Sequence, residues 1–340
     1  AVTLVLQGCA STPPSPAGTK APDARLPATA ADTKQQLDAL FENYFEDNLR
    51  ANPLLATYIG DHRYDDLLPN SIGPQYRAAA QAMNQKYLAA IRALDPDSLA
   101  PADRISYDIF LFEFPFHLLP INQAGSLLTM MPALGSGTNA QPFETVADYE
   151  RWLQRLDGLV VWMDQAIVNL REGAAKGVVQ PRAVMEKVLV QLDAMAVPQA
   201  QDSQYYAPIQ RLPASFSAAD RERITAEYTA MPDGQFLPAY QRLRDFVRDD
   251  YLPQARSSVA WTALPDGQAW YDYYVQEHTT TKLTPDEIHA LGHSEVKRIL
   301  GEMDEVRRQV GFKGNLEAFF TLLETDPQFY FTQGSDLLAG

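Results

Sequence analysis

Two histidines near the C-terminal end have the spacing of a helical metal site. His289 and His293 stand four residues apart in the string HALGH, so on a helix both rings can reach one Zn²⁺ ion. In the zinc-peptidase motif H-E-x-x-H the general base directly follows the first histidine, whereas this sequence has Ala290 there. Glu295, two residues past His293, lies round the side of the helix. We therefore predict no metal ligand in this string.

A run of hydroxyl side chains stands shortly before this pair. His278 is followed by Thr279, Thr280 and Thr281. Three hydroxyls beside an imidazole can hydrogen-bond a carboxylate or a peptide backbone, and the same residues can also simply end a helix. We take these four residues as candidates for binding a peptide substrate or a small ligand.

No other string supports a known reaction. The sequence has no nucleophile elbow of the form G-x-S-x-G, and its glycines form no phosphate-binding loop. A single cysteine excludes an internal disulfide framework and a cysteine-rich zinc module. We predict no catalytic residue within these 340 residues.

The net charge excludes one class of partner. The chain carries 43 acidic against 28 basic residues, a formal net charge of -15. Nucleic-acid binding depends on basic patches that neutralise phosphates, so we expect no nucleic-acid partner. With 46% hydrophobic residues, most of the chain should fold around a packed core.

The first residues resemble the end of a lipoprotein signal peptide. Residues 1–8 are mostly apolar, and the string LQGCAS places a small residue directly before Cys9, as in the bacterial lipobox. We therefore predict lipid attachment at Cys9 and a membrane anchor. Ala10 is not the aspartate that favours retention at the inner membrane, so we expect the periplasmic face of the outer membrane. Residues 9–33, rich in proline and alanine, should form a disordered tether.

The remaining residues, 34–340, predict a helical domain. Apolar residues recur at spacings of three and four, and Thr284-Pro285 followed by Glu287 is a helix start signal. We expect a mainly α fold, a multi-helix array with little or no β structure beyond a short hairpin near 259–264. The stretch 120–142 should be a long loop. Helices are predicted over about 33–52, 74–94, 101 onward, 146–171, 181–196, 217–230, 234–259, 284–310 and 315–324.

The C-terminal residues predict an interrupted helix. Ser335 and Asp336 can cap a helix that is only beginning when the sequence stops at Gly340. We therefore expect this chain to be the N-terminal part of a longer protein, and its missing C-terminal half to be a partner within the same polypeptide.

Several strings, in order along the chain, resemble a known bacterial family. They are IGDHRYDD (59–66), LLPINQ (118–123), FETVADYERWLQRL (143–156), LREGAAKGVVQPRAV (170–184), YLPQAR (251–256), the block from 264 to 303 around YYVQEHTTTKLTPDEIHALGH, and GFKGNLEAFFTLLETDPQFYF (311–331). These strings are similar to the family known as domain of unknown function 885. Its members are largely helical and often secreted or lipid-anchored, and they resemble gluzincin-type metallopeptidases such as the carboxypeptidase Taq group.

The resemblance implies a zincin-like helical fold and a division of labour. The family's presumed metal motif, His-Glu-Gly followed by Gly-His-His, belongs to the C-terminal half and does not occur here. Zinc is therefore expected in the full-length protein with ligands outside this chain. The resulting hypothesis is a periplasmic zinc-dependent peptidase of which this chain, inactive alone, is the N-terminal part. The alternative is a non-catalytic lipoprotein that binds peptides or an envelope partner.

Overall fold

The computed structural model describes residues 30–117, 141–230 and 234–339. In these ranges every regular element is a helix, and pairing of the β type is limited to an isolated bridge between Pro181 and Arg256. The prediction of a mainly α, multi-helix array is therefore confirmed. Cys9, the end of the signal peptide, most of the tether and nearly all of the predicted loop lie outside the described residues. Within those residues, no helix is long and apolar enough to cross a bilayer.

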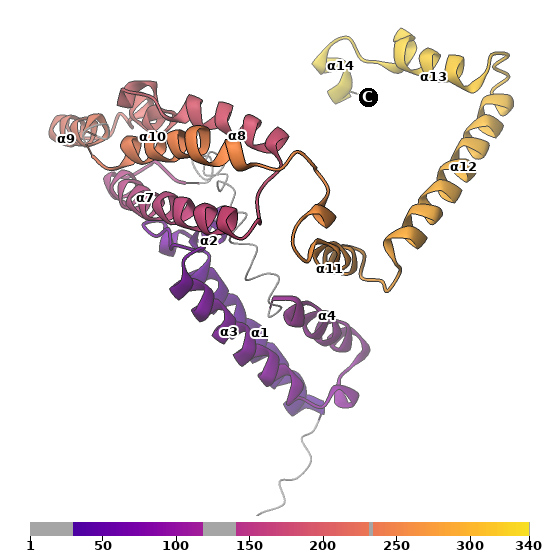
Figure 1. Ribbon diagram of the computed structural model, residues 1–340, viewed down its shortest axis with the longest axis horizontal. Helices are drawn as coiled ribbons and strands as arrows, with labels where there is room; N and C mark the ends of the chain where they lie inside the picture. The colour runs from indigo at the N-terminus through magenta and orange to yellow at the C-terminus, as the bar shows by residue number, and fades with distance from the viewer. Residues whose placement is uncertain (1–29, 118–140, 231–233, 340) are drawn as a thin grey trace, which may run out of the picture. The chain divides into compact units, whose positions relative to one another are not determined.

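The chain divides into two compact units (Figure 1). The first unit comprises residues 1–169 and 191–246, and the second comprises 170–190 and 247–340. Helices α7 and α8 each contribute residues to both. The helices that begin in the first unit are α1 (Ala30–Ala51), α2 (Pro53–Tyr58), η1 (His62–Tyr64), α3 (Pro74–Arg92), η2 (Pro96–Ser98), α4 (Pro101–His117), α7 (Val146–Ala175), η4 (Ala200–Asp202), η5 (Gln204–Arg211), α9 (Ala218–Thr229) and α10 (Phe236–Phe246).

Helices α1, α3 and α4 pack around an apolar core within the first unit. Their apolar residues recur every three or four positions, so each helix has one apolar side. The ring of Tyr44 lies edge-on to those of Tyr87 and Phe110, with centroids 5.2 Å away in both cases. The buried residues of this core are Leu37, Leu40, Tyr87, Leu88, Ile91 and Tyr107.

A second core in the same unit is aromatic. Tyr149 and Trp152 of α7 are fully buried, as are Tyr205 of η5 and Tyr240 of α10. The hydroxyls of Tyr205 and Tyr240 lie 2.7 Å apart, and the hydroxyl of Tyr228 donates to the carbonyl of Tyr149. Burial raises the pKa of Tyr240 and of Tyr228 well above the ordinary value, so both hydroxyls stay protonated. Hydrogen bonding therefore lets these tyrosine hydroxyls occupy the interior of the unit.

The second unit contains the C-terminal helices. They are α8 (Arg182–Met195, ending in the first unit), the π-helical turn η6 (Val247–Tyr251), η7 (Leu252–Gln254), η8 (Trp261–Ala263), α11 (Gly267–Thr279), α12 (Pro285–Gln309), α13 (Leu316–Thr325), η9 (Pro327–Phe329) and α14 (Gly334–Ala339).

Helix α10 ends earlier than the sequence predicted. We expected a helix to about residue 259, but the α-helical part stops at Phe246 and a π-helical turn follows. The hydroxyl of Tyr251 accepts from the backbone N–H of Gln180, and Pro253 has no N–H to continue a helical ladder. This hydrogen bond and the missing donor together favour an end of the α-helix before Tyr251.

The expected hairpin near residues 259–264 is replaced by a helical turn. Residues Trp261–Ala263 form a 3₁₀ turn, and α11 begins shortly afterwards at Gly267. A Cβ atom at Gly267 would lie 2.1 Å from the carbonyl oxygen of Trp261, so only glycine fits there. The close approach of these two segments fixes the start of α11.

Helix α12 begins as its start signal predicted. The hydroxyl of Thr284 accepts from the N–H of Glu287, and the carboxylate of Glu287 accepts from the N–H of Thr284. This reciprocal capping box satisfies two backbone donors that the helix itself cannot. The helix ends before Gly311, whose φ of 75° suits glycine at a helix C-terminus.

Candidate functional site

The segment of His278 and its three threonines forms the turn between α11 and α12. Thr279 is the last residue of α11, and Thr280 adopts the left-handed conformation with φ 57° and ψ 15°. A β-branched residue rarely adopts this conformation, which costs on the order of 1–2 kcal/mol. Glycine is the usual residue at such a position. The turn therefore holds a strained residue beside a solvent-facing surface, a combination that favours a functional role.

A chain of hydroxyl groups connects the two helices at this turn. The hydroxyl of Thr279 donates to the carbonyl of Val275 at 2.7 Å and lies 3.0 Å from the hydroxyl of Thr281. The hydroxyl of Thr281 in turn accepts from the N–H of Leu283 at 3.3 Å. These short-range bonds fix the turn. The threonines therefore do end a helix, as one of the two sequence interpretations held.

The same turn borders a pocket of about 400 Å³ within the second unit. Its polar lining residues include Asp272, Gln276, Thr281 and Lys282. An anion, a cation and neutral hydrogen-bonding groups at one opening can bind a ligand that carries both charges and amides.

The four candidate residues are placed differently around this pocket. Thr281 lines it, whereas His278, Thr279 and Thr280 are not among its lining residues. The side chain of His278 is 73% exposed, with Nδ1 3.6 Å from the Glu277 carboxylate. Lys282 and Asp272, which the sequence analysis did not single out, contribute the charges. Lys282 directly follows the threonines, so adjacency in the sequence was the available signal.

The HALGH histidines lie on an exposed part of α12. The rings of His289 and His293 are perpendicular, with centroids 4.5 Å apart. Among the described residues, no group of three or more His, Cys, Asp or Glu side chains is placed to hold a metal ion. The two histidines therefore do not fit a zinc centre by themselves, because such a centre needs at least a third protein ligand.

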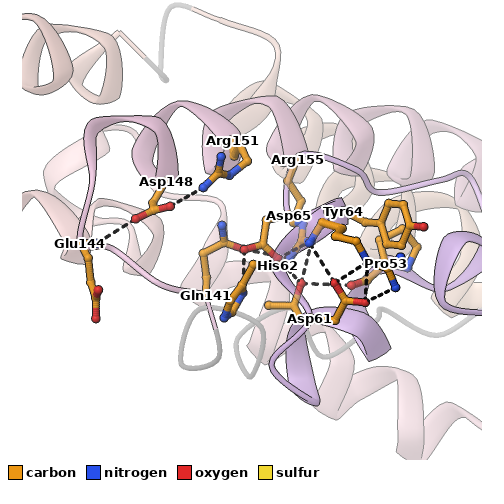
Figure 2. Close-up of polar contacts among 12 residues, drawn as sticks. Pro53, Asp61, His62, Tyr64, Asp65, Gln141, Glu144, Asp148, Arg151 and Arg155 are labelled. Atoms are coloured by element: carbon orange, nitrogen blue, oxygen red, sulfur yellow. Dashed lines mark hydrogen bonds and ion pairs between the residues drawn. The ribbon is translucent and has the colours of Figure 1, made fainter.

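A buried polar cluster in the first unit was missed by the sequence analysis (Figure 2). The Arg155 side chain on α7 is 1% exposed, and that of Asp65 is 0% exposed, with Nη2 of Arg155 3.5 Å from Oδ1 of Asp65. Burial lowers the pKa of Arg155, and the charge of Asp65 opposes that change. Asp65 also accepts from the Thr57 hydroxyl at 2.6 Å and lies 3.0 Å from Nδ1 of His62.

Four hydrogen bonds occupy the guanidinium group of Arg155. Nε donates to the carbonyl of Leu67 at 3.1 Å, and Nη1 donates to the Gln141 side chain at 3.0 Å. Nη2 donates to the Thr57 hydroxyl at 2.9 Å and to the carbonyl of Tyr64 at 2.8 Å. We call Arg155 and Asp65 with these partners the Arg155 clamp. It holds residues 57–67 against α7, so its role is positional rather than chemical.

The start of α7 carries a second polar arrangement close to the clamp in Figure 2. Thr145 and Asp148 form a reciprocal cap: the N–H of Asp148 donates to the Thr145 hydroxyl, and the Asp148 carboxylate accepts from the N–H of Thr145. Burial pushes the pKa of Asp148 up, but hydrogen bonds from Thr145, Glu144 and Arg151 outweigh it and leave that pKa below the ordinary value. Asp148 therefore stays ionised and anchors the first turn of α7.

The fold and these sites define a mainly helical protein that combines an internal ionic clamp with a solvent-open polar turn. The chain belongs to the family described as bacterial protein of unknown function (DUF885), which matches residues 53–339. A search of curated proteins found no match.

Two solved structures share the fold. A protein from Colwellia psychrerythraea, described as a "putative lipoprotein", is 19% identical with a TM-score of 0.72, and the match covers 90% of this chain and 57% of that one. A protein from Shewanella oneidensis, described as a "putative lipoprotein of unknown function", is 14% identical with a TM-score of 0.52, and the match covers 83% and 49%. This chain thus spans little more than half the length of the first and about half of the second.

Proposed function

We propose that this chain is the N-terminal, ligand-binding part of a lipid-anchored envelope protein. In its full length the protein would be a zinc-dependent peptidase that acts on peptides in the periplasm. The observation that carries the proposal is the pocket at the turn between α11 and α12, which Asp272, Thr281 and Lys282 help to line. A peptide offers amide groups and terminal charges, and these match that lining.

The catalytic part of the proposal rests on the resemblance to gluzincin-type peptidases. The ligands and the general base would come from sequence outside this chain. When bound, zinc would supply Lewis-acid activation of the scissile carbonyl. The residues of this chain would bind and orient the peptide along one wall of the cleft.

The anchor rests on separate observations. The string LQGCAS places Cys9 in a lipobox-like context. Both structural neighbours are described as a "putative lipoprotein". Lipid on Cys9 would hold the protein at the periplasmic face of the outer membrane. In the full precursor, Cys9→Ala should abolish labelling by a fatty-acid probe, and unchanged labelling would disprove the anchor.

A non-catalytic binding lipoprotein is the competing proposal, since the same pocket would serve it. Metal analysis and peptide hydrolysis by the full-length protein separate the two. One equivalent of zinc with hydrolysis supports the peptidase, whereas peptide binding with neither supports the binder.

Binding itself can be tested at the turn with a matched control. Thr281→Val removes a hydroxyl from the pocket, and Lys282→Met removes its cation. Thr229→Val is the control, because Thr229 is the last residue of α9 and its exposed hydroxyl donates to the carbonyl of Thr225. In titrations with short unmodified peptides, we expect Thr281→Val to weaken binding about fivefold, the value of one neutral hydrogen bond. Lys282→Met should weaken binding of peptides with a free carboxylate by more than that. Equal affinities in all three variants would refute the assignment of this pocket.

A further inference from the structure

The apolar side of α12 is open to solvent over most of its length. In the sequence, Ile288, Leu291 and Ile299 mark an apolar side, which predicts burial, yet no residue of this 25-residue helix is buried. From Val296 to Val310 the apolar positions recur at spacings of three and four, and Ile288 lies eight residues before Val296, so all of them share one face. We call this face the α12 stripe; it consists of Ile288, Val296, Ile299, Met303, Val306 and Val310.

The stripe is a large apolar surface for a single helix. At 1.5 Å per residue it runs for about 33 Å. Val306 is 50% exposed and Val296 is 56% exposed. The opposite side is stabilised without any partner, because Arg298 forms ion pairs with both Glu295 and Glu302. On the apolar side, Val296, Ile299, Met303, Val306 and Val310 all remain exposed.

Helix α13 extends the stripe into a groove of about 940 Å³. Met303, Val306 and Val310 of the stripe form one wall, and Phe319 and Leu323 of α13 belong to the other. The lining is thus aliphatic and aromatic, which suits the apolar face of a helix.

Arg307 holds the two walls of this groove in place. Its Nη1 donates to the carbonyls of Phe312 and Gly314 at 2.9 and 2.7 Å, and its Nε donates to Asp304 at 2.7 Å. These bonds tie the turn between α12 and α13 to α12 itself. The hydrogen bonds of Arg307 therefore fix the position of α13 relative to α12 and, with it, the shape of the groove.

We propose that this groove binds the apolar face of a helix from the additional polypeptide that longer members of the family possess. The inference rests on the proposed function in one respect, namely that this chain is part of a longer protein. The match to the Colwellia chain leaves more than two fifths of that chain uncovered, which is ample length for such a helix. An exposed apolar patch of this length and continuity is the mark of an interface.

Cysteine accessibility in the full-length protein tests the proposal directly. Val306→Cys places a thiol in the groove. Lys297→Cys is the control, because Lys297 is exposed on the opposite face of the same helix, about two and a half turns before Val306. Cys9, the single cysteine of the 340-residue chain, and any cysteine of the additional polypeptide are replaced by serine in both. Labelling rates with a maleimide are normalised to the rate of each variant unfolded in urea. We expect Val306→Cys to react at least tenfold more slowly than Lys297→Cys in the full-length protein, and at a similar rate in the 340-residue chain.

Two results would overturn the proposal. Equal normalised rates in the full-length protein would mean that nothing covers the groove. Protection of Val306→Cys in the 340-residue chain that grows with protein concentration would assign the groove to a second copy instead. Met303→Cys, compared with the same control, repeats the measurement should Val306→Cys fold poorly. Zinc content and peptide binding do not enter these rates, so a failure of the proposed enzymatic function is distinguishable from a failure of the docking proposal.

Discussion

Replacing Arg155 with methionine should strongly destabilise the first unit. The substitution keeps an apolar stem of similar length but removes the charge and four hydrogen bonds at 2.8–3.1 Å. It leaves the fully buried Asp65 carboxylate without the Arg155 cation, next to the Thr57 hydroxyl and His62. Removing one member of a buried ion pair costs about 3–5 kcal/mol, because the remaining charge stays desolvated.

The assay is urea unfolding followed by far-ultraviolet circular dichroism and tryptophan fluorescence. We expect the midpoint of the first unit to fall by about 1 M urea or more. Arg242→Met is the control, since Arg242 is 43% exposed and pairs with Asp164 at the surface of the same unit. Its cost should be at most about 1 kcal/mol. The double variant Asp65→Asn/Arg155→Met should cost less than the sum of the single changes, because no lone charge remains. A cost for Arg155→Met no larger than that of the control would refute the clamp.

Further predictions concern single residues. The lowered pKa of Asp148 contributes stability that is fully present above the unfolded pKa near 3.8 and is lost as pH falls through the folded pKa. Asp148→Ala should therefore lower the free energy of unfolding in urea by about 1 kcal/mol at pH 7. The difference in stability between this variant and the wild type should shrink at pH 3. Gly267→Ala places a Cβ 2.1 Å from the carbonyl oxygen of Trp261, so the melting temperature should fall by several degrees, and an unchanged value would contradict that contact. His289→Ala and His293→Ala should each cost on the order of 1 kcal/mol or less and leave the zinc content of the full-length protein unchanged; loss of zinc in either variant would place the metal chemistry in this chain.

Local signals in the sequence predicted the helices well. The Thr284 capping box, the first-turn proline of α3 and the apolar spacing of α1 each depend on residues within a turn or two of one another. The end of α10 was missed because Val247 and Tyr251 continue a helical apolar spacing, while the bond that redirects the chain comes from the distant Gln180.

The remaining wrong predictions depend on contacts between residues that are far apart in the sequence. Periodicity identified the apolar side of α12 but carried no information about what covers it, so a face predicted to be buried is exposed. Arg155 looks in the sequence like any surface arginine of an amphipathic helix, and its burial follows only from the position of residues 57–67. The string IGDHRYDD did mark that segment, although nothing in it pointed to a partner on α7. For the threonine turn, the sequence left binding and helix ending open, and the turn combines a helix end with a pocket.

The Arg155 clamp also has a consequence for the lifetime of the folded state. Its hydrogen bonds join residues that are 88, 91 and 98 positions apart, so forming them requires closure of a long loop. Contacts of such high sequence separation tend to form after the local helices, on the native side of the folding barrier. Stability that is absent from the transition state acts on the unfolding rate and hardly on the folding rate. The clamp should therefore slow the unfolding of the first unit more than it changes the rate of its folding.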